Sequence, residues 1–373
     1  MKIALVHMRH SNVGGTELFL NQLSKYLCEQ GEDVTIICRT HVEPSHPNIK
    51  FVQLKPFSIG KAHRVYQFAK AVEKHVKNTH YDVVYGLGKT WSHDLIRIGG
   101  GTRKHVVELR KNQKPSWRDR VSLYIERRSV QSDHCKIVVS NSNKTSQELI
   151  SDYGVDPKKI VTIHNAVETK RFDRERLKPE VDNLIQELKL DISVPTFLFL
   201  GSGYNRKGLK SLLDAYKLID FKSNLLIVGN ENHPEEYMDY AKQLGVYDSC
   251  QFLGKQNKPE LFFSLADCYI LPTKYEPFGF TVIEALSCGT PTITTQECGA
   301  KEVIDSNVST VLSSGYSSQE LADAMSHWAH LRGDIELKKQ CRQSVMKQDV
   351  EAVMKENHNV ILDIYTDSNK GFS

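Results

Sequence analysis

Hydrophobic positions along the chain fall into two recurring patterns. Short, mainly apolar runs such as residues 2–7, 34–38 and 195–200 predict strands buried on both faces of a sheet. Longer stretches with apolar residues three and four positions apart, such as 18–27 and 64–77, predict amphipathic helices. Since strands and helices alternate, we expect an α/β fold built on doubly wound parallel sheets.

The length of the chain and one weakly patterned stretch predict two domains. At 373 residues the chain exceeds one typical hydrophobic core and suits two α/β domains. A charged stretch with little periodicity over residues 171–191 is predicted to mark the boundary between them. We therefore expect a first domain over residues 1–168 and a second domain over residues 169–354.

The stretch 275–286 carries the strongest candidate chemistry. It follows an apolar strand predicted at 268–272 and leads into a predicted helix, so its loop lies at a strand's carboxyl end, where open α/β sheets bind ligands. Glu276 and Glu284 bracket the loop, and Gly279 lets the backbone approach a ligand. A helix N-terminus favours an anion, and carboxylates accept hydrogen bonds from hydroxyl groups. The pattern suits a sugar joined to a phosphate, although two solvated glutamates would fit equally well.

Two glycine-containing loops are further candidates for phosphate binding. Residues 201–208 form a glycine-rich turn before a predicted helix, and Arg206 and Lys207 in it could offset the charge of a diphosphate. Residues 12–17 contain a glycine pair before another helix, whose N-terminus could meet a phosphate. Arginine-lysine pairs at helix starts are usually solvated, and a glycine pair usually marks a simple turn, so neither signal is specific alone.

Three segments resemble one known family. EPFGFTVIEAL, followed by SCGTPTITTQECGAKEVI, is similar to the donor-binding segment of the retaining family 4 glycosyltransferases, which have the GT-B fold. FLGSGYNRKGLKSLLDAY and VGGTELFLNQLSKYL resemble the diphosphate loop and the first loop and helix of that family. The resemblance implies two Rossmann-like domains that face each other across a cleft. It also implies that the second domain binds the nucleotide-sugar and that a C-terminal helix of about residues 355–373 packs back on the first, acceptor-side domain.

The resemblance assigns a role to each candidate site residue. Glu276 would contact the donor sugar and Glu284 the ribose. Arg206 and Lys207 would hold the diphosphate. A region that follows a run of three glycines often supplies a histidine to this site, and His105 is the nearest candidate, although a solvated histidine fits as well. Other donor-site positions implied are Gly15, Gly203, Leu253, Gly279, Phe280, Thr281 and Val282.

The implied activity is that of a retaining glycosyltransferase that moves a hexose from a nucleotide diphosphate sugar to an acceptor hydroxyl. A UDP-sugar is the expected donor. Length and motif layout are similar to bacterial enzymes that add hexoses to the lipopolysaccharide core, so a cell-surface glycan or glycolipid is the expected acceptor. Two alternatives stay open: a nucleotide-sugar epimerase or hydrolase of the same fold, and a non-catalytic sugar- or membrane-binding protein.

Positive charge is concentrated in one part of the chain. Residues 103–136 contain ten Lys or Arg and four Asp or Glu, whereas the whole chain has a net charge of only +4. Apolar residues recur there at helical spacing among arginines, a pattern typical of a helix that binds an anionic membrane. They are Trp117, Val121, Tyr124 and Ile125. A core-packed helix with a solvated basic face fits as well, and nucleic acid is the weaker alternative because no nucleic-acid-binding motif accompanies the charge.

Other sequence features bear on location and cofactors. No apolar run approaches bilayer length and the N-terminus does not suit a signal peptide, so we expect a cytoplasmic protein, peripheral at the inner face of the cytoplasmic membrane. The eight cysteines form no C-x-x-C pair and are expected to be reduced core residues. The histidines lack metal-ligand spacing and no Asp-x-Asp occurs, so we expect no metal and no cofactor besides the nucleotide-sugar substrate.

Overall fold

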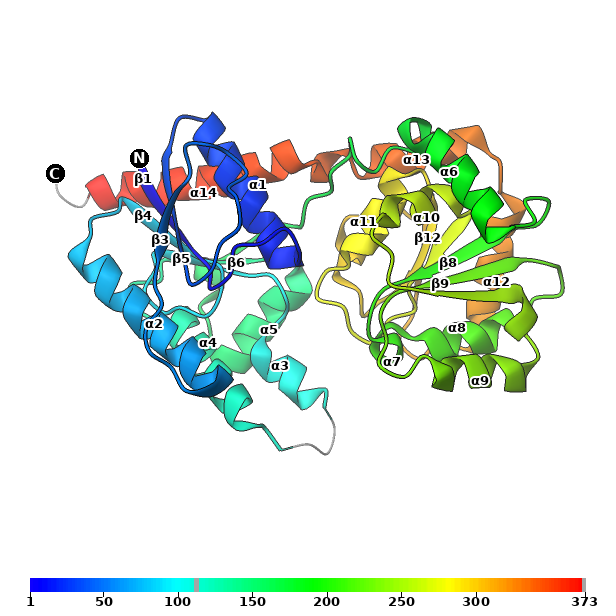
Figure 1. Cartoon of the computed structure of the whole chain (residues 1–373), viewed down its shortest axis with the longest axis horizontal. Helices are drawn as coiled ribbons and strands as arrows, with labels where there is room; N and C mark the ends of the chain where they lie inside the picture. Colours follow the sequence, from blue (N-terminus) through cyan, green and yellow to red (C-terminus); the bar gives the residue numbers. More distant parts are fainter. Residues whose placement is uncertain (111–113, 371–373) are drawn as a thin grey trace. The chain divides into compact units, whose positions relative to one another are not determined.

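The chain forms two compact units (Figure 1). The computed structural model describes residues 1–110 and 114–370. The first unit contains Met1–His164 together with the C-terminal segment from Glu351, and the second contains Asn165–Val350. Each unit has its own parallel sheet.

The first unit is built on a seven-stranded parallel sheet. Its strands are β1 (Lys2–Val6), β2 (Asp33–Cys38), β3 (Lys50–Gln53), β4 (Val83–Gly86), β5 (Leu95–Ile98), β6 (Ile137–Ser140) and β7 (Ile160–Thr162). They lie in the order β3-β2-β1-β4-β5-β6-β7, so strand addition reverses direction between β1 and β4. The helices of this unit are α1 (Gly15–Glu29), α2 (Gly60–Asn78), α3 (Arg103–Glu108), α4 (Trp117–Val130), α5 (Asn143–Tyr153) and α14 (Val350–Lys370).

The second unit repeats this plan with six parallel strands. They are β8 (Thr196–Leu200), β9 (Asn224–Val228), β10 (Cys250–Gly254), β11 (Cys268–Ile270), β12 (Thr292–Thr295) and β13 (Ser309–Leu312). Their order is β10-β9-β8-β11-β12-β13, which reverses between β8 and β11. The helices are α6 (Arg174–Leu188), α7 (Tyr204–Lys207), α8 (Leu209–Tyr216), α9 (Glu235–Leu244), α10 (Pro259–Leu265), α11 (Phe280–Ser287), α12 (Ser318–His330) and α13 (Ile335–Ser344).

The apolar runs lie at the centre of these sheets. Phe197, Leu198 and Phe199 of β8 are completely buried, and so is Tyr269 of β11. Burial on both faces of a parallel sheet explains why these strands are apolar at successive positions instead of alternating with polar residues. The predicted fold class, with a doubly wound parallel sheet in each half of the chain, is confirmed.

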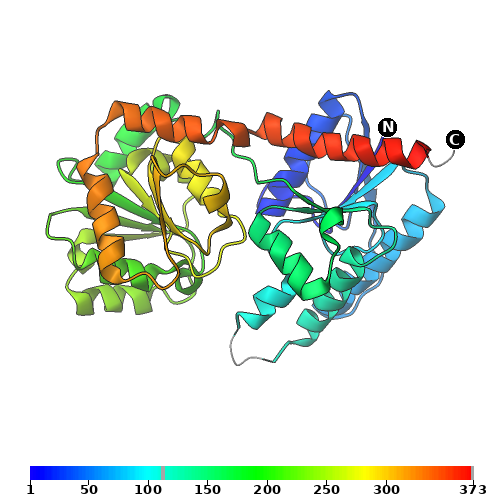
Figure 2. The same ribbon diagram turned by 180° about the vertical axis from the view of Figure 1, so that it is seen from behind.

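The C-terminal helix α14 belongs to the first unit. Tyr85 at the centre of that unit's sheet donates a buried hydrogen bond of 2.9 Å from its hydroxyl to Asn357 Oδ1. His358 Nε2 lies 3.0 Å from Glu32 Oε1. Figure 2 shows α14, in red, running along the first unit. These contacts attach the end of the chain to elements formed by its beginning.

Most of the charged stretch over residues 171–191, in which no helix was predicted, forms helix α6 of the second unit. Asp173 caps this helix by accepting hydrogen bonds from the backbone amides of Glu175 and Arg176. Leu177 and Val181, one helical turn apart, are buried in the core of the second unit. Leu184, Ile185 and Leu188 pack partly buried against the same core, so apolar residues recur at helical spacing along most of the helix.

A short interval separates α13 from α14. In this interval the amide of Val167 donates to the carbonyl of Gln348 at 2.8 Å, and the Thr169 hydroxyl donates to Asp349 Oδ2 at 2.5 Å. Backbone groups that pair with another segment cannot also complete a helix. The helix ends where the chain passes residues 167–169.

Helix α4 is partly a core helix. Ile125 is 2% exposed and packs with Val65, Ala69 and Trp91, and Val121 packs against the same cluster. Trp117, in contrast, is 71% exposed at the start of the helix. The apolar face predicted for membrane contact is therefore largely occupied by the protein itself. Residues 111–113 of the basic segment 103–136 lie outside the described residues.

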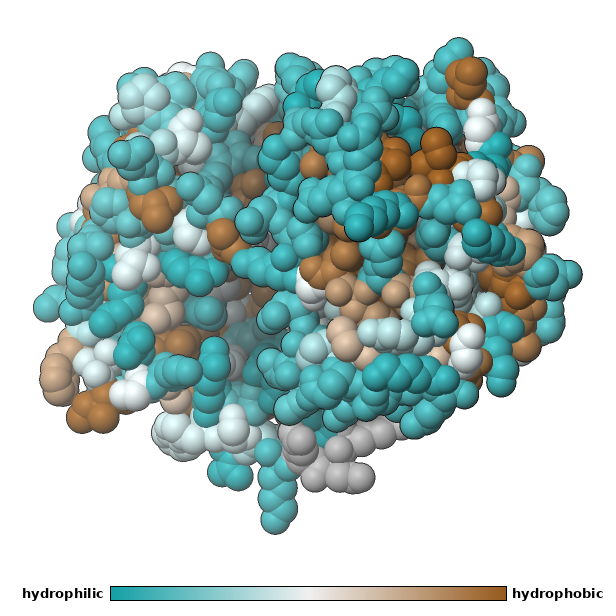
Figure 3. Space-filling view, turned by 45° about the vertical axis from the view of Figure 1, so that its right-hand side comes forward, coloured by the Kyte–Doolittle hydropathy of each residue, from teal (hydrophilic) through white to brown (hydrophobic). Residues whose placement is uncertain are grey.

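One face of the molecule is mainly polar (Figure 3). On the face shown in Figure 3, hydrophilic residues predominate and hydrophobic ones form smaller patches. Of the helices formed by residues 1–110 and 114–370, none has the length and apolar character needed to cross a membrane. The eight cysteines are all buried free thiols, as predicted.

Candidate active site

The predicted donor-site residues of the second unit gather at the ends of two neighbouring strands. Arg206 and Lys207 follow β8, and Glu276 and Glu284 follow β11. These two strands pair with each other at the point where the strand order reverses. Open α/β sheets bind ligands at such a switch point because the loops on either side diverge there.

The loop after β8 is shaped around the side chain of Lys207. A Cβ atom on Gly201 would lie 2.4 Å from Lys207 Cδ and 2.5 Å from Cε, so a larger residue there would push the lysine side chain out of this position. Gly203 precedes α7 with a φ of 79°, a left-handed conformation that favours glycine. The result is a lysine side chain that is only 9% exposed, with its ammonium group directed to the loop after β11.

The loop after β11 is held by a second segment of chain. The amide of Glu276 donates to the carbonyl of Glu297 at 3.0 Å, and the amide of Gly299 donates to the carbonyl of Glu276 at 3.0 Å. The thiol of Cys298 donates to the carbonyl of Phe278 at 3.0 Å. These contacts fix the backbone on both sides of the Glu276 side chain.

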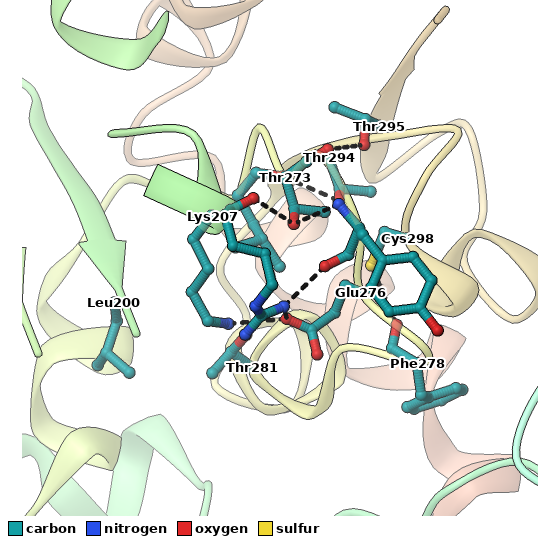
Figure 4. Close-up of polar contacts among 12 residues, drawn as sticks. Leu200, Lys207, Thr273, Glu276, Phe278, Thr281, Thr294, Thr295 and Cys298 are labelled. Carbon is teal, nitrogen blue, oxygen red and sulfur yellow. Dashed lines mark hydrogen bonds and ion pairs between the residues drawn. The ribbon is translucent and has the colours of Figure 1, made fainter. Parts of the chain in front are cut away.

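Arg206, Lys207 and Glu276 form one cluster of charges. Arg206 Nη1 donates to Glu276 Oε2 at 2.8 Å, and Lys207 Nζ donates to the same oxygen at 3.0 Å (Figure 4). Arg206 Nη1 also donates to the carbonyl of Tyr275 at 2.7 Å. Burial alone would raise the pKa of Glu276, but the Lys207 and Arg206 cations outweigh it and lower that pKa. Glu276 is thus held as an anion between two cations.

Helix α11 begins directly beside this cluster. Gly279 precedes it with a φ of 104°, and a Cβ there would lie 2.7 Å from Cys298 Sγ. Phe280, Thr281 and Val282 form its first turn, and the amide of Val282 donates to the carbonyl of Gly279 at 3.0 Å. The glycine is required here both by its backbone angle and by the close thiol.

Tyr269 is a residue that sequence reasoning missed. Its phenol oxygen, within the completely buried side chain, lies 3.1 Å from the carbonyl oxygen of Leu200 and 2.7 Å from Thr281 Oγ1. It therefore links the end of β8 to the first turn of α11. A tyrosine in an otherwise apolar strand was the available signal, because a buried hydroxyl needs a partner.

Glu284 lies on α11 in a surrounding of mixed charge. Burial raises its pKa to about 7; the Arg171 cation opposes this shift, and the carboxylates of Glu168 and Glu260 add to it. Arg171 Nη2 donates to Glu260 Oε2 at 2.9 Å. Residues 168, 171 and 260 are far from Glu284 in sequence, so their influence was not foreseen.

Leu253 lies at a break in the pairing between β10 and β9. The register shifts between Phe252 and Gly254, and Leu253 is skipped in the ladder. Its carbonyl accepts a hydrogen bond of 2.8 Å from Gln256 Nε2. The bulge separates this carbonyl from the sheet, as is common next to functional sites.

Gly15 lies in the first unit, at the start of α1. The preceding Gly14 has a φ of 117°, and a Cβ on it would lie 2.2 Å from Glu17 Oε2. Glu17 accepts from Arg9 Nε at 2.9 Å and Nη2 at 2.6 Å. The His7 ring, whose Nε2 lies 3.8 Å from Glu17 Oε1, and the Arg9 cation lower the pKa of Glu17 to about 2. The structure thus adds Glu17 as the residue that shapes the glycine loop.

His105 also lies in the first unit, in the short helix α3. Its backbone amide donates to Thr102 Oγ1 at 3.2 Å, which caps the helix. Thr102 in turn donates its own amide to Glu148 Oε2 at 2.9 Å. These contacts describe a capped helix start, and the role assigned to the His105 side chain stays a prediction.

Two family models match the chain, one in each half. The model described as glycosyl transferases group 1 matches residues 180–348, and the model described as glycosyltransferase family 4 matches residues 13–171. Together these matches cover most of the chain. The protein belongs to the group 1 glycosyltransferases, and its N-terminal half matches glycosyltransferase family 4.

Curated and solved relatives agree with this family. N-acetyl-alpha-D-glucosaminyl L-malate synthase of Bacillus anthracis is 23% identical, over 82% of this chain and 81% of that protein. The lipopolysaccharide glucosyltransferase WaaG of Escherichia coli K12 is 20% identical, over 87% of this chain and 88% of that protein. A crystal structure of WaaG matches 96% of this chain and 99% of that chain, with a TM-score of 0.79 and 20% identity. The crystal structure of HepE of Anabaena in complex with UDP and glucose matches 97% of this chain and 100% of that chain, with a TM-score of 0.72 and 18% identity. The GT-B fold is thereby confirmed.

Aspartate, glutamate, histidine and cysteine side chains are the usual protein ligands of metal ions. In the described part of the chain, no three or more of these side chains are grouped in a way that could hold a metal ion. The positive charge next to Glu276 comes from Arg206 and Lys207.

Proposed function

We propose that this protein is a retaining hexosyltransferase that uses a nucleotide diphosphate sugar, with UDP-sugar as the expected donor, and needs no metal or cofactor. The observation that carries the proposal is the cluster of Arg206, Lys207 and Glu276 at the switch point of the second sheet, next to the N-terminus of α11. Two cations, a carboxylate and a helix start match the charges and hydroxyls of a sugar diphosphate.

Each residue has a distinct part in this proposal. Arg206 and Lys207 bind the diphosphate and stabilise the charge that develops on it as it leaves. Glu276 accepts hydrogen bonds from sugar hydroxyls, and Glu284 accepts them from the ribose. Tyr269 positions Thr281 at the helix start through the short contact between their oxygens. His105 of the first unit is the proposed partner of the transferred sugar.

The proposed reaction is a same-face displacement. The bond between the anomeric carbon and the diphosphate oxygen breaks while the acceptor oxygen bonds to that carbon on the same face. The acceptor's proton passes to an oxygen of the departing diphosphate. Charge moves onto the diphosphate in this step, which is why two cations there would favour it.

The donor is tested by thermal unfolding with UDP, GDP and ADP and with their hexose conjugates. A ligand that binds only the folded state stabilises it by about 2.7 kcal/mol at a hundred times its Kd. We expect the nucleotides of one base to raise the Tm of the wild type. This rise in Tm should be lost in Glu284→Ala. If none of the three raises the Tm, the protein is not a transferase of these donors.

The proposed acceptor is a cell-surface glycan or glycolipid, and the proposed location is the cytoplasmic face of the membrane. The name of one relative, a lipopolysaccharide glucosyltransferase, supports this acceptor class. On α4 the exposed Trp117 adjoins the exposed Arg118 and Arg120. An aromatic ring flanked by cations suits an anionic lipid surface, where each cation contributes about 1 kcal/mol.

Membrane binding is tested with vesicles that contain anionic lipid. The triple variant Trp117→Ala, Arg118→Gln, Arg120→Gln is expected to lose sedimentation with the vesicles. The double variant Lys222→Gln, Lys242→Gln, which removes two exposed charges in the second unit, is the control and should still bind. If the wild type and both variants bind the vesicles equally, the proposed membrane contact through Trp117, Arg118 and Arg120 is wrong.

The epimerase or hydrolase alternative makes a different prediction. Such an enzyme converts the nucleotide-sugar in the absence of any acceptor, whereas the proposed transferase requires the acceptor hydroxyl for rapid turnover. Release of the nucleoside diphosphate at the same rate with and without acceptor would favour the alternative.

A further inference from the structure

The two cations proposed to hold the diphosphate are already paired with a carboxylate of the protein. Both of them donate to a single atom, Glu276 Oε2, at 2.8 and 3.0 Å. The Glu276 side chain is 16% exposed and that of Lys207 is 9% exposed, so their pair is largely shielded from water, whereas the Arg206 side chain is 42% exposed. Figure 4 shows the Lys207 ammonium and the Glu276 carboxylate directed at each other.

A diphosphate would need the same donor groups. Its oxygens form short, charge-assisted hydrogen bonds to arginine and lysine, as carboxylate oxygens do. If the diphosphate bound beside the unmoved carboxylate, like charges would lie within a few ångströms of each other in a shielded site, where their repulsion is strong. The two anions therefore compete for the same two cations, and close binding of one disfavours close binding of the other.

We propose that Glu276 is an internal counter-ion which the donor's diphosphate displaces, and that this exchange frees the carboxylate to bind the sugar. The inference rests on the proposed function, because it takes a nucleotide diphosphate sugar as the ligand. It gives Glu276 two alternative partners, the cations before the donor binds and the sugar hydroxyls afterwards.

The local structure allows the side chain to move while its backbone stays in place. The amide and the carbonyl of Glu276 are both held by residues 297 and 299, at 3.0 Å each. Next to its side chain is Gly279, where a Cβ would lie 3.4 Å from Glu276 Cγ. The exchange therefore needs only rotation about the side-chain bonds of Glu276.

The exchange makes Glu276 a residue that discriminates between donor and product. An intact nucleotide-sugar displaces the carboxylate but returns hydrogen bonds to it through the sugar. A nucleoside diphosphate displaces it and returns none. After transfer the carboxylate can pair with Arg206 and Lys207 again, which weakens the hold on the diphosphate product and favours its release.

Calorimetric titration with UDP, GDP and ADP tests the inference on wild type, Glu276→Gln and Glu231→Gln. The glutamine keeps an acceptor oxygen but removes the charge, so the nucleoside diphosphate that binds the wild type should bind Glu276→Gln about tenfold more tightly. Glu231 accepts a hydrogen bond of 2.7 Å from the backbone amide of Tyr204, in the loop after β8. Its variant therefore controls for the loss of a nearby negative charge and should change the affinity for the nucleoside diphosphate at most about twofold.

The outcomes separate this inference from the proposed function. If a nucleoside diphosphate binds the wild type but binds Glu276→Gln equally or more weakly, the inference is wrong and the proposed function stands. If none of the three binds the wild type, both are wrong. A crystal structure with the bound nucleoside diphosphate gives a second test. We expect Glu276 Oε2 to lie beyond about 3.5 Å from both cations, and unchanged pairs would overturn the inference.

Discussion

At the scale of single residues, the pKa of Glu284 depends on neighbours that cannot be read from its position in the sequence. The paired glutamates were recognised from the loop and from family resemblance. The protonation of Glu284 depends on burial and on Arg171, Glu168 and Glu260, which the fold brings near it. Sequence spacing gave no sign of these neighbours, whereas the positions of Arg206, Lys207 and Glu276 were predicted because each lies in a recognisable loop.

The raised pKa of Glu284 predicts a pH-dependent contribution to stability. Burial places the pKa near 7 in the folded state, above the ordinary value of 4.5, so the folded state binds the proton more tightly than the unfolded state between these pH values. The wild type therefore loses stability relative to Glu284→Gln as the pH rises from about 4.5 to about 7. Below and above this window the difference is constant.

Thermal unfolding of both proteins across this pH range checks the prediction. The Tm of Glu284→Gln relative to wild type should rise by at least about 2 °C through the window. A difference in Tm that does not vary with pH would mean that Glu284 titrates at its ordinary value.

At the scale of elements, the loops at the ends of β8 and β11 were predicted as loops, but not the way they fit together. Gly201 was seen as part of a phosphate-binding turn, whereas in the structure it makes room for Lys207. The hydroxyl of Tyr269 contacts Leu200 at the end of β8, 69 residues away, and Thr281 in the first turn of α11, 12 residues away. Helix α6 was missed although its apolar residues recur at helical spacing, because the charged residues between them outnumber the apolar ones. Contacts between distant segments are not visible in a local pattern.

The variant Gly201→Ala tests the shape of the loop after β8. Its Cβ would displace the Lys207 side chain, so we expect the affinity for the nucleoside diphosphate to fall by at least about tenfold, as for the loss of a charged hydrogen bond. Gly245→Ala is the matched control. Gly245 has a φ of 77° with nothing within 4 Å of its Cβ position, so alanine there should cost about 1–2 kcal/mol of stability and leave the affinity unchanged. Equal loss of affinity in both variants would show that only general destabilisation matters.

At the scale of the whole molecule, the two sheets follow from the alternation of apolar runs and amphipathic helices, and this part of the fold was predictable. The distribution of charge was less so. The basic segment was predicted to offer an apolar face to a membrane, but Ile125 and Val121 use that face to pack on α2 and its neighbours. Periodicity shows that a helix has an apolar face and does not show what covers it. The attachment of α14 to the first unit was inferred from family resemblance, not from its pattern.

The contact between Tyr85 and Asn357 predicts how strongly α14 supports the first unit. The change Asn357→Ala removes a buried acceptor for the tyrosine hydroxyl and should lower the stability by about 1–3 kcal/mol. Glu356→Ala changes the exposed neighbouring position on the same helix and should have little effect. Thermal unfolding compares the two, and similar Tm values for both variants would contradict a stabilising role for this hydrogen bond.

The central claim is that Arg206 and Lys207 hold the diphosphate of a nucleotide-sugar and stabilise it as it leaves. The most direct measurement is the rate of hexose transfer from the donor identified by thermal unfolding, with the wild type and with the double variant Arg206→Ala, Lys207→Ala. We predict that the double variant loses a factor of about 10² or more in turnover and binds the donor more weakly. Full turnover with unchanged donor affinity would contradict the account.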